Sequence, residues 1–504
     1  MSSECSATAL LNVVQAELNE ARLHPRHVEL FQRVLGILIQ ASDPLQKRLK
    51  RQQALVWALV LIDHADDLIN RTVFNKVNVE TRIVYMLASI CKAAAHLSQI
   101  SVTESLDGDA GEPSTISDSV IHACDDGPKQ HQTQTHHLRN ALQALDKGVL
   151  VTGAPVASDQ VAMWIHQLQT QIISIAPHPL IIHEPPLYLT SALPVQGRVS
   201  QQLSRLSPQC AVKLYLLPPS ISKFNEHLGG ASPATPIVIQ GAISHWPCFN
   251  DRPWRDVAYL LTQIGPDRLV PVEIGSRYTD ETWTQKLLPV SDLMQHIIDG
   301  ERLSDTPISP HTIASNHASA VMYLAQHNLL DQIPSLALDV EVPDYCITAP
   351  PRSHRAKLPH LDPTSIRQAP NTHSTLSDTV IEANNDEDDD QEVRVNTWLG
   401  PLGTHSPLHT DPHDNLFAQV VGFKYVRMYA PTETLKLYPY AASTLLSNTS
   451  QVDVACPDFS QFPDFAHANY VECVVGPRDV LLIPRGWWHY VASLTSSISV
   501  SFWF

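Results

Sequence analysis

Apolar residues recur at three- and four-residue steps through much of the first two hundred positions. The stretches with this pattern are 28–38, 55–62, 83–97, 138–151 and 161–175. Steps of three and four place side chains on one face of an α-helix, so the pattern is typical of packed amphipathic helices. The sequence therefore predicts a helical N-terminal domain over residues 1–195.

The pattern changes near residue 215, where short apolar runs begin to alternate with turn residues. Examples are "TPIVIQGAISHWP", "LFAQVVGFKYVRMYAP" and "SSISVSFWF", and glycine stands at several of the turns. Such runs are strand signals, and several are spaced as hairpins. We expect an all-β barrel or jelly roll over residues 215–504, and an α+β fold for the whole chain.

Two polar segments interrupt these patterns. Residues 101–137 are rich in Asp, Ser, Gly, Gln and His, and residues 349–392 are rich in proline and end near the acidic run "NNDEDDD". Such compositions bury too little apolar surface to offset the entropy of ordering, so we expect two disordered insertions. We favour solvated histidines over a metal site for His131, His136 and His137, because no fixed framework holds them. The acidic run is best interpreted as a solvated loop, with guidance of basic substrates as the alternative.

Charge and cysteine usage narrow the class of protein. The 504 residues include 34 Lys plus Arg against 51 Asp plus Glu, a formal net charge of −17. This balance argues against nucleic-acid binding by bulk phosphate attraction and is compatible with a basic peptide or protein partner. Eight scattered cysteines without a C-x-x-C pair indicate neither a zinc ribbon nor a secreted disulfide framework, and favour a reducing compartment.

No targeting or membrane segment is evident in the sequence. The N-terminus lacks a basic region before an apolar run, and the longest apolar stretch, residues 54–62, is far shorter than the roughly 20 residues that span a bilayer. We expect a soluble, intracellular protein without membrane contact.

The stretch "PLHTDPHDN" carries the clearest candidate chemistry. Side chains at i and i+2 of a strand share a face, so His409 and Asp411 would present an imidazole and a carboxylate side by side. An H-x-D pair also arises by chance in a chain with 25 histidines. A further imidazole in a strand context would favour a metal site over a chance pair.

His489 is the preferred third ligand among the three histidines downstream of Asp411. An apolar strand and a tight turn at Gly486 precede it, and two tryptophans would bury it. His413 follows a proline that ends the strand, so a third ligand there would strain one short segment. His467 lies in a polar stretch without strand character.

The triad of His409, Asp411 and His489 would leave three positions of an octahedral ion open. That arrangement is the one that non-haem Fe(II) oxygenases use to bind a bidentate co-substrate and dioxygen. A closed structural zinc site would instead use four protein ligands. The sequence therefore predicts a catalytic iron site.

A carboxylate co-substrate also requires a cation in the barrel. Lys424 lies on the strand that follows the Gly422 turn, and Arg427 three residues on has the opposite strand parity. A lysine on a strand is more often a surface residue. We nevertheless favour Lys424 as the cation.

At these residues the sequence resembles the JmjC family of Fe(II)- and 2-oxoglutarate-dependent oxygenases. The resemblance is carried by "RLVPVEIGSRYTDETW", "YLAQHNLLDQIPSL", "NTWLGPLGTHSPLHTDPHDNLFAQVVGFKYVRMYAP" and "IPRGWWHYVASLTSSISVSFWF", and is strongest toward the branch of JmjC-domain-containing protein 5, also called lysine demethylase 8 or arginyl hydroxylase. It implies a double-stranded β-helix of the cupin, or jelly-roll, type. It also implies Fe(II) as cofactor, with 2-oxoglutarate and O2 as co-substrates.

The resemblance also implies roles for individual residues. His409, Asp411 and His489 would ligate Fe(II), and Lys424 would pair with the distal carboxylate of 2-oxoglutarate. The remaining co-substrate residues would be Tyr323, Ser406, Asn415 and Trp503. The substrate residues would be Glu273, Tyr278 and Trp398, a set that suits a guanidinium, although Glu273 could instead be a surface charge and Trp398 a core aromatic.

These assignments imply a protein hydroxylase that acts on arginine side chains. The partner would be an arginine-containing protein such as a histone, or a ribosomal or chromatin-associated protein. A histone methyl-lysine demethylase or histone-tail peptidase is the alternative within the family, and a non-catalytic chromatin-associated scaffold is the alternative from another class. The resemblance implies nuclear residence, with a cytoplasmic pool as a second expectation, and "PLQKRLKRQQ" is only a weak basic cluster.

Overall fold

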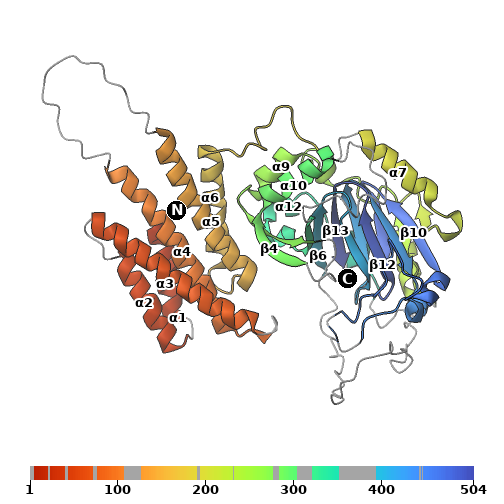
Figure 1. Cartoon of the computed structure of the whole chain (residues 1–504), viewed down its shortest axis with the longest axis horizontal. Coiled ribbons are helices and arrows are strands. Elements are labelled where there is room, and N and C mark those ends of the chain that lie inside the picture. The colour runs from red at the N-terminus through yellow and green to blue at the C-terminus, as the bar shows by residue number, and fades with distance from the viewer. Residues whose placement is uncertain are drawn as a thin grey trace. The chain divides into compact units, whose positions relative to one another are not determined.

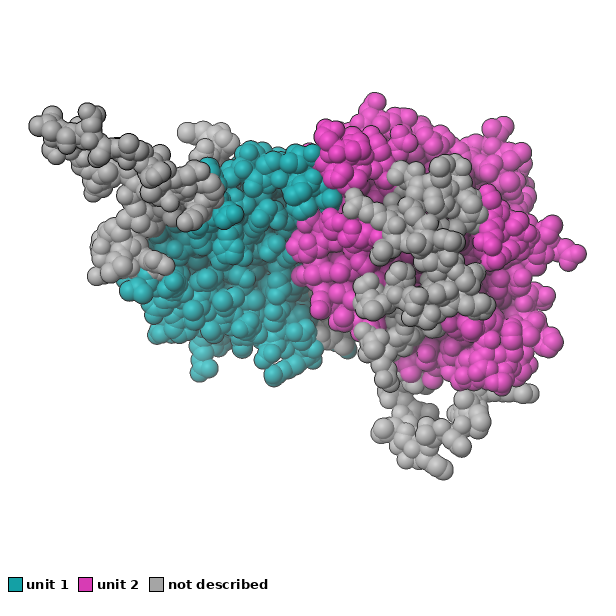
Figure 2. All heavy atoms as spheres, turned by 45° about the horizontal axis from the view of Figure 1, so that its top comes forward, with its two compact units in different colours: residues 1–182, 265–269 teal, residues 183–264, 270–504 magenta. Residues whose placement is uncertain are grey.

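The computed structural model describes most of the chain. The described residues are 5–20, 23–39, 44–71, 76–106, 127–189, 193–230, 232–275, 283–303, 321–350, 393–441, 444 and 446–504. The chain divides into two compact units, residues 1–182 with 265–269 and residues 183–264 with 270–504 (Figure 2). Each unit has a hydrophobic core of its own.

The first unit is helical, as the periodicity predicts. Helix α4 packs against both α3 and α5, and the core between the helices is built from Phe31, Ala58, Leu87, Leu142 and Trp164, all nearly or completely buried. The helices are α1 (Ala7–Glu20), α2 (Pro25–Ile39), α3 (Pro44–Asn70), α4 (Val79–Leu106), α5 (Gly127–Thr152) and α6 (Ser158–Ile175) (Figure 1).

One helix of the described chain has the length and composition of a membrane span. This stretch, Val79–Ile100 of α4, has a mean hydropathy of 1.3 over its most apolar window, and 72% of that window is buried against neighbouring helices. A central helix of a helical bundle has the same properties, because it is apolar on all sides.

The segment 101–137 is not disordered throughout, contrary to the prediction. Helix α4 continues to Leu106 and α5 already begins at Gly127, while residues 107–126 lie outside the described residues. Thr135 is buried, and the Nδ1 atoms of His137 and His96 lie 3.4 Å apart between α5 and α4. Packing against α4 therefore orders polar residues whose composition alone predicts disorder. The second predicted insertion falls almost wholly on residues 351–392, which are also outside the described residues.

The second unit contains both sheets and several short helices. Its helices are α7 (Leu193–Arg205), α8 (Ile221–Gly229), α9 (Val257–Ile264), α10 (Val290–Leu303), α11 (Leu329–Gln332), α12 (Pro334–Ala337) and α13 (Asp344–Ile347). Its strands are β1 (Lys213–Tyr215), β2 (Ile237–Ile239), β3 (Leu269–Ile274), β4 (Thr284–Pro289), β5 (Met322–His327), β6 (Arg394–Gly400), β7 (His405–Thr410), β8 (Asn415–Val421), β9 (Lys424–Tyr429), β10 (Tyr470–Val475), β11 (Val480–Ile483), β12 (Trp488–Ser493) and β13 (Ser497–Trp503).

Two sheets face each other in this unit. The nine-stranded sheet has the order β1-β2-β11-β8-β13-β6-β5-β3-β4, and the four-stranded sheet has the order β10-β9-β12-β7. Phe417 and Ile483 of the larger sheet share one core with Val426, Met428 and Val491 of the smaller sheet. Helices α9, α10 and α12 gather at one side of the strands (Figure 1). The α+β fold with a C-terminal cupin-type jelly roll is confirmed.

Candidate metal centre and co-substrate pocket

The two histidines of the predicted triad lie on neighbouring antiparallel strands. His409 near the end of β7 is the register partner of His489 on β12, and their ring centroids are 4.2 Å apart. Asp411 follows β7 directly, and its carbonyl oxygen accepts a hydrogen bond from the Gly486 backbone amide, 3.1 Å away. The turn that precedes β12 is thereby tied to the end of β7.

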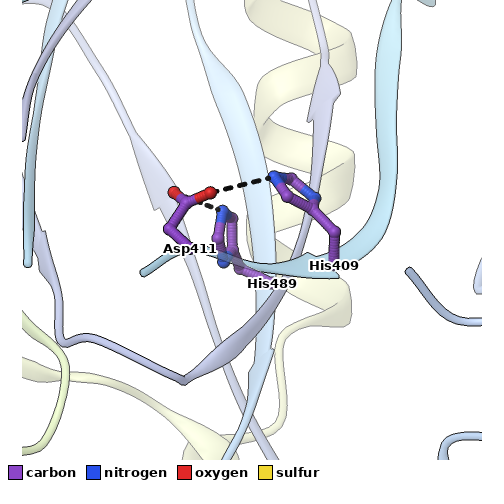
Figure 3. A group of neighbouring side chains, drawn as sticks. All are labelled: His409, Asp411 and His489. Carbon is purple, nitrogen blue, oxygen red and sulfur yellow. Dashed lines mark ion pairs between the residues drawn. The ribbon is translucent and has the colours of Figure 1, made fainter. Parts of the chain in front are cut away.

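The three side chains point toward one another (Figure 3). Asp411 Oδ1 lies 3.7 Å from His409 Nε2, and Asp411 Oδ2 lies 3.4 Å from His489 Nε2. The ligand atoms all lie within 4.8 Å of one another, so one ion can contact all three. Among the described residues, no other group of three or more His, Cys, Asp or Glu side chains has this geometry.

Backbone carbonyl groups set the orientation of both imidazoles. His409 Nδ1 lies 2.7 Å from the Pro407 oxygen, and His489 Nδ1 lies 3.0 Å from the Trp487 oxygen. A carbonyl oxygen can only accept, so each Nδ1 donates its proton and each neutral ring keeps the lone pair on Nε2. Hydrogen bonding through the other ring nitrogen is the usual arrangement of a metal-binding histidine.

Electrostatics favour a metal-binding protonation state at two of these groups. Burial, reinforced by the neighbouring His489, lowers the pKa of His409 to about 4. Burial alone would raise the pKa of Asp411, but His489, His409 and a hydrogen bond from Asn415 outweigh it and lower that pKa to about 2. A neutral imidazole and an ionised carboxylate at neutral pH are the forms that ligate a divalent cation.

Lys424 lies at the base of a pocket shared with the triad. Its side chain is 1% exposed, and its Nζ lies 3.2 Å from the Tyr323 hydroxyl. The ammonium group also lies 5.4 Å from the ring centroid of Phe417 and 6.0 Å from that of Trp398. Burial lowers the pKa of Lys424 to about 7. Within the described part of the chain no carboxylate pairs with it.

Two buried polar atoms in this pocket have no hydrogen-bond partner within the described structure. They are Asn415 Oδ1 and Trp503 Nε1. An unsatisfied buried polar group costs about 1–3 kcal/mol, and an unpaired ammonium costs more. Lys424 Nζ and Trp503 Nε1 are donors that suit an anionic ligand, whereas Asn415 Oδ1 can only accept a hydrogen bond. The donors of the pocket thus match the charge of a dicarboxylate beside three side chains that can ligate a metal ion.

The structure brings all of the predicted co-substrate residues to this pocket. Tyr323 on β5, Ser406 on β7, Asn415 at the start of β8 and Trp503 at the end of β13 line it. Arg427, the rejected competitor of Lys424, contacts Glu472 and Tyr425 instead. The strand parity used to choose between the two cations therefore holds.

The predicted substrate residues are only partly brought together. Glu273 on β3 is the register partner of Tyr323 on β5, and Trp283 Nε1 donates to Glu273 Oε2 over 3.4 Å. Burial raises the pKa of Glu273. Trp398 on β6 lies inside the pocket, with its ring centroid 5.9 Å from that of Tyr323. Tyr278 lies outside the described residues.

Several pocket residues are absent from the sequence prediction. Phe417 and Val491 each follow a predicted site residue by two positions on the same strand, so strand parity could have found them. Gln326 has no such signal. It has a φ of 50° and lies where the β5–β6 register shifts between Leu324 and His327, and this irregularity turns it toward the pocket.

Comparison with known proteins places this unit in a family. The Cupin-like domain family matches residues 224–504. Lysine-specific demethylase 8 of Danio rerio is 41% identical over 285 residues, which cover 56% of this chain and 56% of the relative. JmjC domain-containing protein D of Dictyostelium discoideum is 36% identical over 296 residues, covering 58% of this chain and 56% of the relative.

A third relative also bears the Jumonji C (JmjC) domain name. Jumonji C domain-containing protein 5 of Drosophila melanogaster is 34% identical over 303 residues, covering 60% of this chain and 62% of the relative. The chain spans less than two thirds of the length of each of these relatives. The family match covers more than half of this chain. The chain therefore belongs to the cupin-like family, and it resembles relatives that bear JmjC names.

Proposed function

We propose that this protein is an Fe(II)- and 2-oxoglutarate-dependent hydroxylase of arginine side chains in protein substrates. The observation that carries the proposal is the half-buried carboxylate of Glu273, the register partner of Tyr323 of the co-substrate pocket. A guanidinium can meet such a carboxylate with a forked pair of hydrogen bonds. The indole of Trp398, in the same pocket, offers a face for stacking.

Separate residues of the pocket would bind the metal and 2-oxoglutarate. His409, Asp411 and His489 would hold Fe(II), and Lys424 would bind the distal carboxylate of 2-oxoglutarate. Tyr323, Ser406, Asn415 and Trp503 would complete the co-substrate site. When bound, the metal and 2-oxoglutarate supply the oxidising chemistry that uses O2. The chain itself determines which C–H bond of the substrate lies nearest that centre.

The buried ammonium of Lys424 supports its assignment to 2-oxoglutarate binding. It lies among three aromatic rings without a carboxylate partner in the described residues, so an anionic ligand would recover the cost of burying it. The hydroxyl oxygen of Tyr323 accepts a hydrogen bond from Lys424 Nζ and is also hydrogen-bonded with the Ser406 side chain, so one tyrosine holds both neighbours. A dicarboxylate is thereby held at one end while its other end is free to meet the metal.

Demethylation of methyl-lysine is the second candidate, because a relative bears the name lysine-specific demethylase 8. It would use the same metal and co-substrate. A pocket with one half-buried acid, Glu273, and one indole, Trp398, suits a guanidinium better than a methylated ammonium, which favours the first candidate. The intact triad with Lys424 supports an enzyme over a scaffold. We further propose that the substrates are basic nuclear proteins.

Substrate-stimulated succinate formation tests the proposal. Three peptides that differ only at the central residue, which is arginine, trimethyl-lysine or alanine, are each incubated with the protein, Fe(II) and 2-oxoglutarate. We expect the arginine peptide alone to raise the rate of succinate formation above that of the alanine peptide. Stimulation by the trimethyl-lysine peptide with release of formaldehyde would support the demethylase instead.

A further inference from the structure

A second cavity opens on the opposite face of the nine-stranded sheet. It has a volume of about 210 Å³ and is lined by Val480 of β11. Ile483 of the same strand lines the metal pocket. Residues three apart on a strand point to opposite faces, so the sheet itself separates the two sites. The second cavity is therefore no extension of the metal pocket.

The floor of this cavity is apolar, and packed side chains form one wall. Ile243, Trp246 and Val480 form the floor and are each about 1% exposed. Tyr345 forms part of the wall. Its ring stacks on Phe224 with centroids 4.4 Å apart, and its hydroxyl donates to the Pro219 carbonyl oxygen over 2.6 Å. These contacts preform the cavity before any ligand enters.

The rim of the cavity carries an excess of carboxylates. Glu341 and Asp344 both line it, and the basic group that faces them is His245, whose Nε2 lies 3.4 Å from Glu341 Oε2. Both members of that pair are well exposed, at 60% and 62%. Among the described residues, no lysine or arginine lines the cavity. An apolar floor beneath an acidic rim is the complement of a long aliphatic stem that ends in a cation.

We propose that this cavity binds a lysine or arginine side chain of a partner polypeptide. The methylene stem lies on Trp246 and Ile243, and the cationic head reaches the carboxylates of Glu341 and Asp344. The excess of acidic residues over the whole chain, 51 against 34 basic, favours such a partner at longer range. This site concerns binding alone, so it does not rest on the proposed hydroxylase activity.

Saturation-transfer NMR on the full-length protein, without iron or 2-oxoglutarate, tests this site. The probes are capped pentapeptides with a central lysine, arginine, norleucine or aspartate between glycines. We expect saturation at the lysine and arginine side-chain protons and none at aspartate. Norleucine has a comparable stem without the charge, so its binding should be weaker. Equal binding of norleucine and lysine would overturn the proposal, because the rim charges would then contribute nothing.

Variants locate the binding on this face. Glu341→Gln and Asp344→Asn should each weaken lysine-peptide binding about two- to fivefold, the range expected of an exposed ion pair. Ala242→Leu fills the cavity without changing charge and should abolish binding. Asp251→Asn removes an exposed carboxylate elsewhere in the same unit and should have no effect. Undiminished binding by the Ala242→Leu variant would contradict the proposed location.

Two further variants test whether the peptide binds in the metal-side pocket or competes with basic residues of the chain itself. Glu273→Gln changes the register partner of Tyr323 in the metal pocket and no residue that lines the second cavity, so lysine-peptide binding should persist. Its loss would assign the signal to the metal-side pocket and overturn the proposal. Alanine at Arg352, Arg355 and Lys357, which lie outside the described residues, should leave the affinity unchanged. Tighter binding by that triple variant would show that the chain's own basic residues compete for the cavity, and would overturn the assignment to a partner.

Discussion

His409 and His489 are register partners across the β7–β12 ladder, with their ring centroids 4.2 Å apart. Two strands therefore fix the two imidazoles independently of any ion. We expect His489→Ala to weaken binding of Mn(II), used as a redox-stable substitute for Fe(II), by more than about 100-fold, since loss of a mere supporting hydrogen bond costs 10–100-fold at such sites. Isothermal titration calorimetry measures this.

The matched control for that variant is His467→Ala, which removes an exposed histidine of the same unit. It should bind Mn(II) like the unmodified protein. Equal affinities of the His489→Ala and unmodified proteins would contradict the metal assignment.

The affinity for 2-oxoglutarate should depend on pH through Lys424. Burial lowers the pKa of this amine to about 7 in the free protein, and a bound carboxylate would raise it. Above pH 7 the amine must therefore take up a proton when the ligand binds. The dissociation constant should rise about tenfold per pH unit above pH 7 and be flat below it.

The measurement is a titration of the Mn(II)-loaded protein with 2-oxoglutarate at several pH values. Lys424→Met removes the titrating amine and should bind weakly with no such slope. A flat profile for the unmodified protein would show that Lys424 does not meet the ligand.

The turn that carries Lys424 into the barrel should depend on Gly422. This residue has a φ of 75°, and a Cβ added there would collide with the Ser496 carbonyl oxygen and the Thr495 hydroxyl. Gly403 has a similar φ of 86° but open space around it. Gly422→Ala should therefore lower the free energy of unfolding by about 1–3 kcal/mol more than Gly403→Ala, the typical cost of overpacking. Urea unfolding of both variants measures the difference in the free energy of unfolding. Equal decreases in the two variants would count against this role of the turn.

Glu273→Gln keeps the shape of the proposed substrate acid and removes its charge. Loss of a charge-assisted hydrogen bond costs about 1.5–3 kcal/mol, so KM for an arginine peptide should rise by roughly 10- to 100-fold. The affinity for 2-oxoglutarate should stay within about twofold, because Lys424 and the triad are unchanged. Trp283→Phe, which removes the indole donor to Glu273, should show a smaller rise. An unchanged KM in Glu273→Gln would assign substrate recognition to other residues.

Strand periodicity predicted much of the metal-side pocket. The i, i+2 relation correctly placed His409 beside Asp411, and parity correctly separated Lys424 from Arg427. These relations depend only on the alternation of side chains along a strand. Sequence therefore suffices where a site is built from regular strands.

The features that the sequence did not predict depend on irregular backbone and on tertiary packing. Gln326 enters the pocket through a register shift and a left-handed φ, which no alternation predicts. The first turns of α5 were expected to be disordered, yet packing against α4 orders them. The second cavity forms where the loop around Glu341 meets β11 and α8, and such meetings of distant segments leave no periodic signal.

Mass spectrometry of a peptide product tests the central claim most directly. An arginine-containing peptide is incubated with the protein, Fe(II), 2-oxoglutarate and O2, in parallel with the Asp411→Ala variant. We predict a gain of one oxygen atom on the arginine side chain with the unmodified protein and no change with the variant. Loss of a methyl group from a methyl-lysine peptide in place of this gain, or equal hydroxylation by Asp411→Ala, would contradict the account.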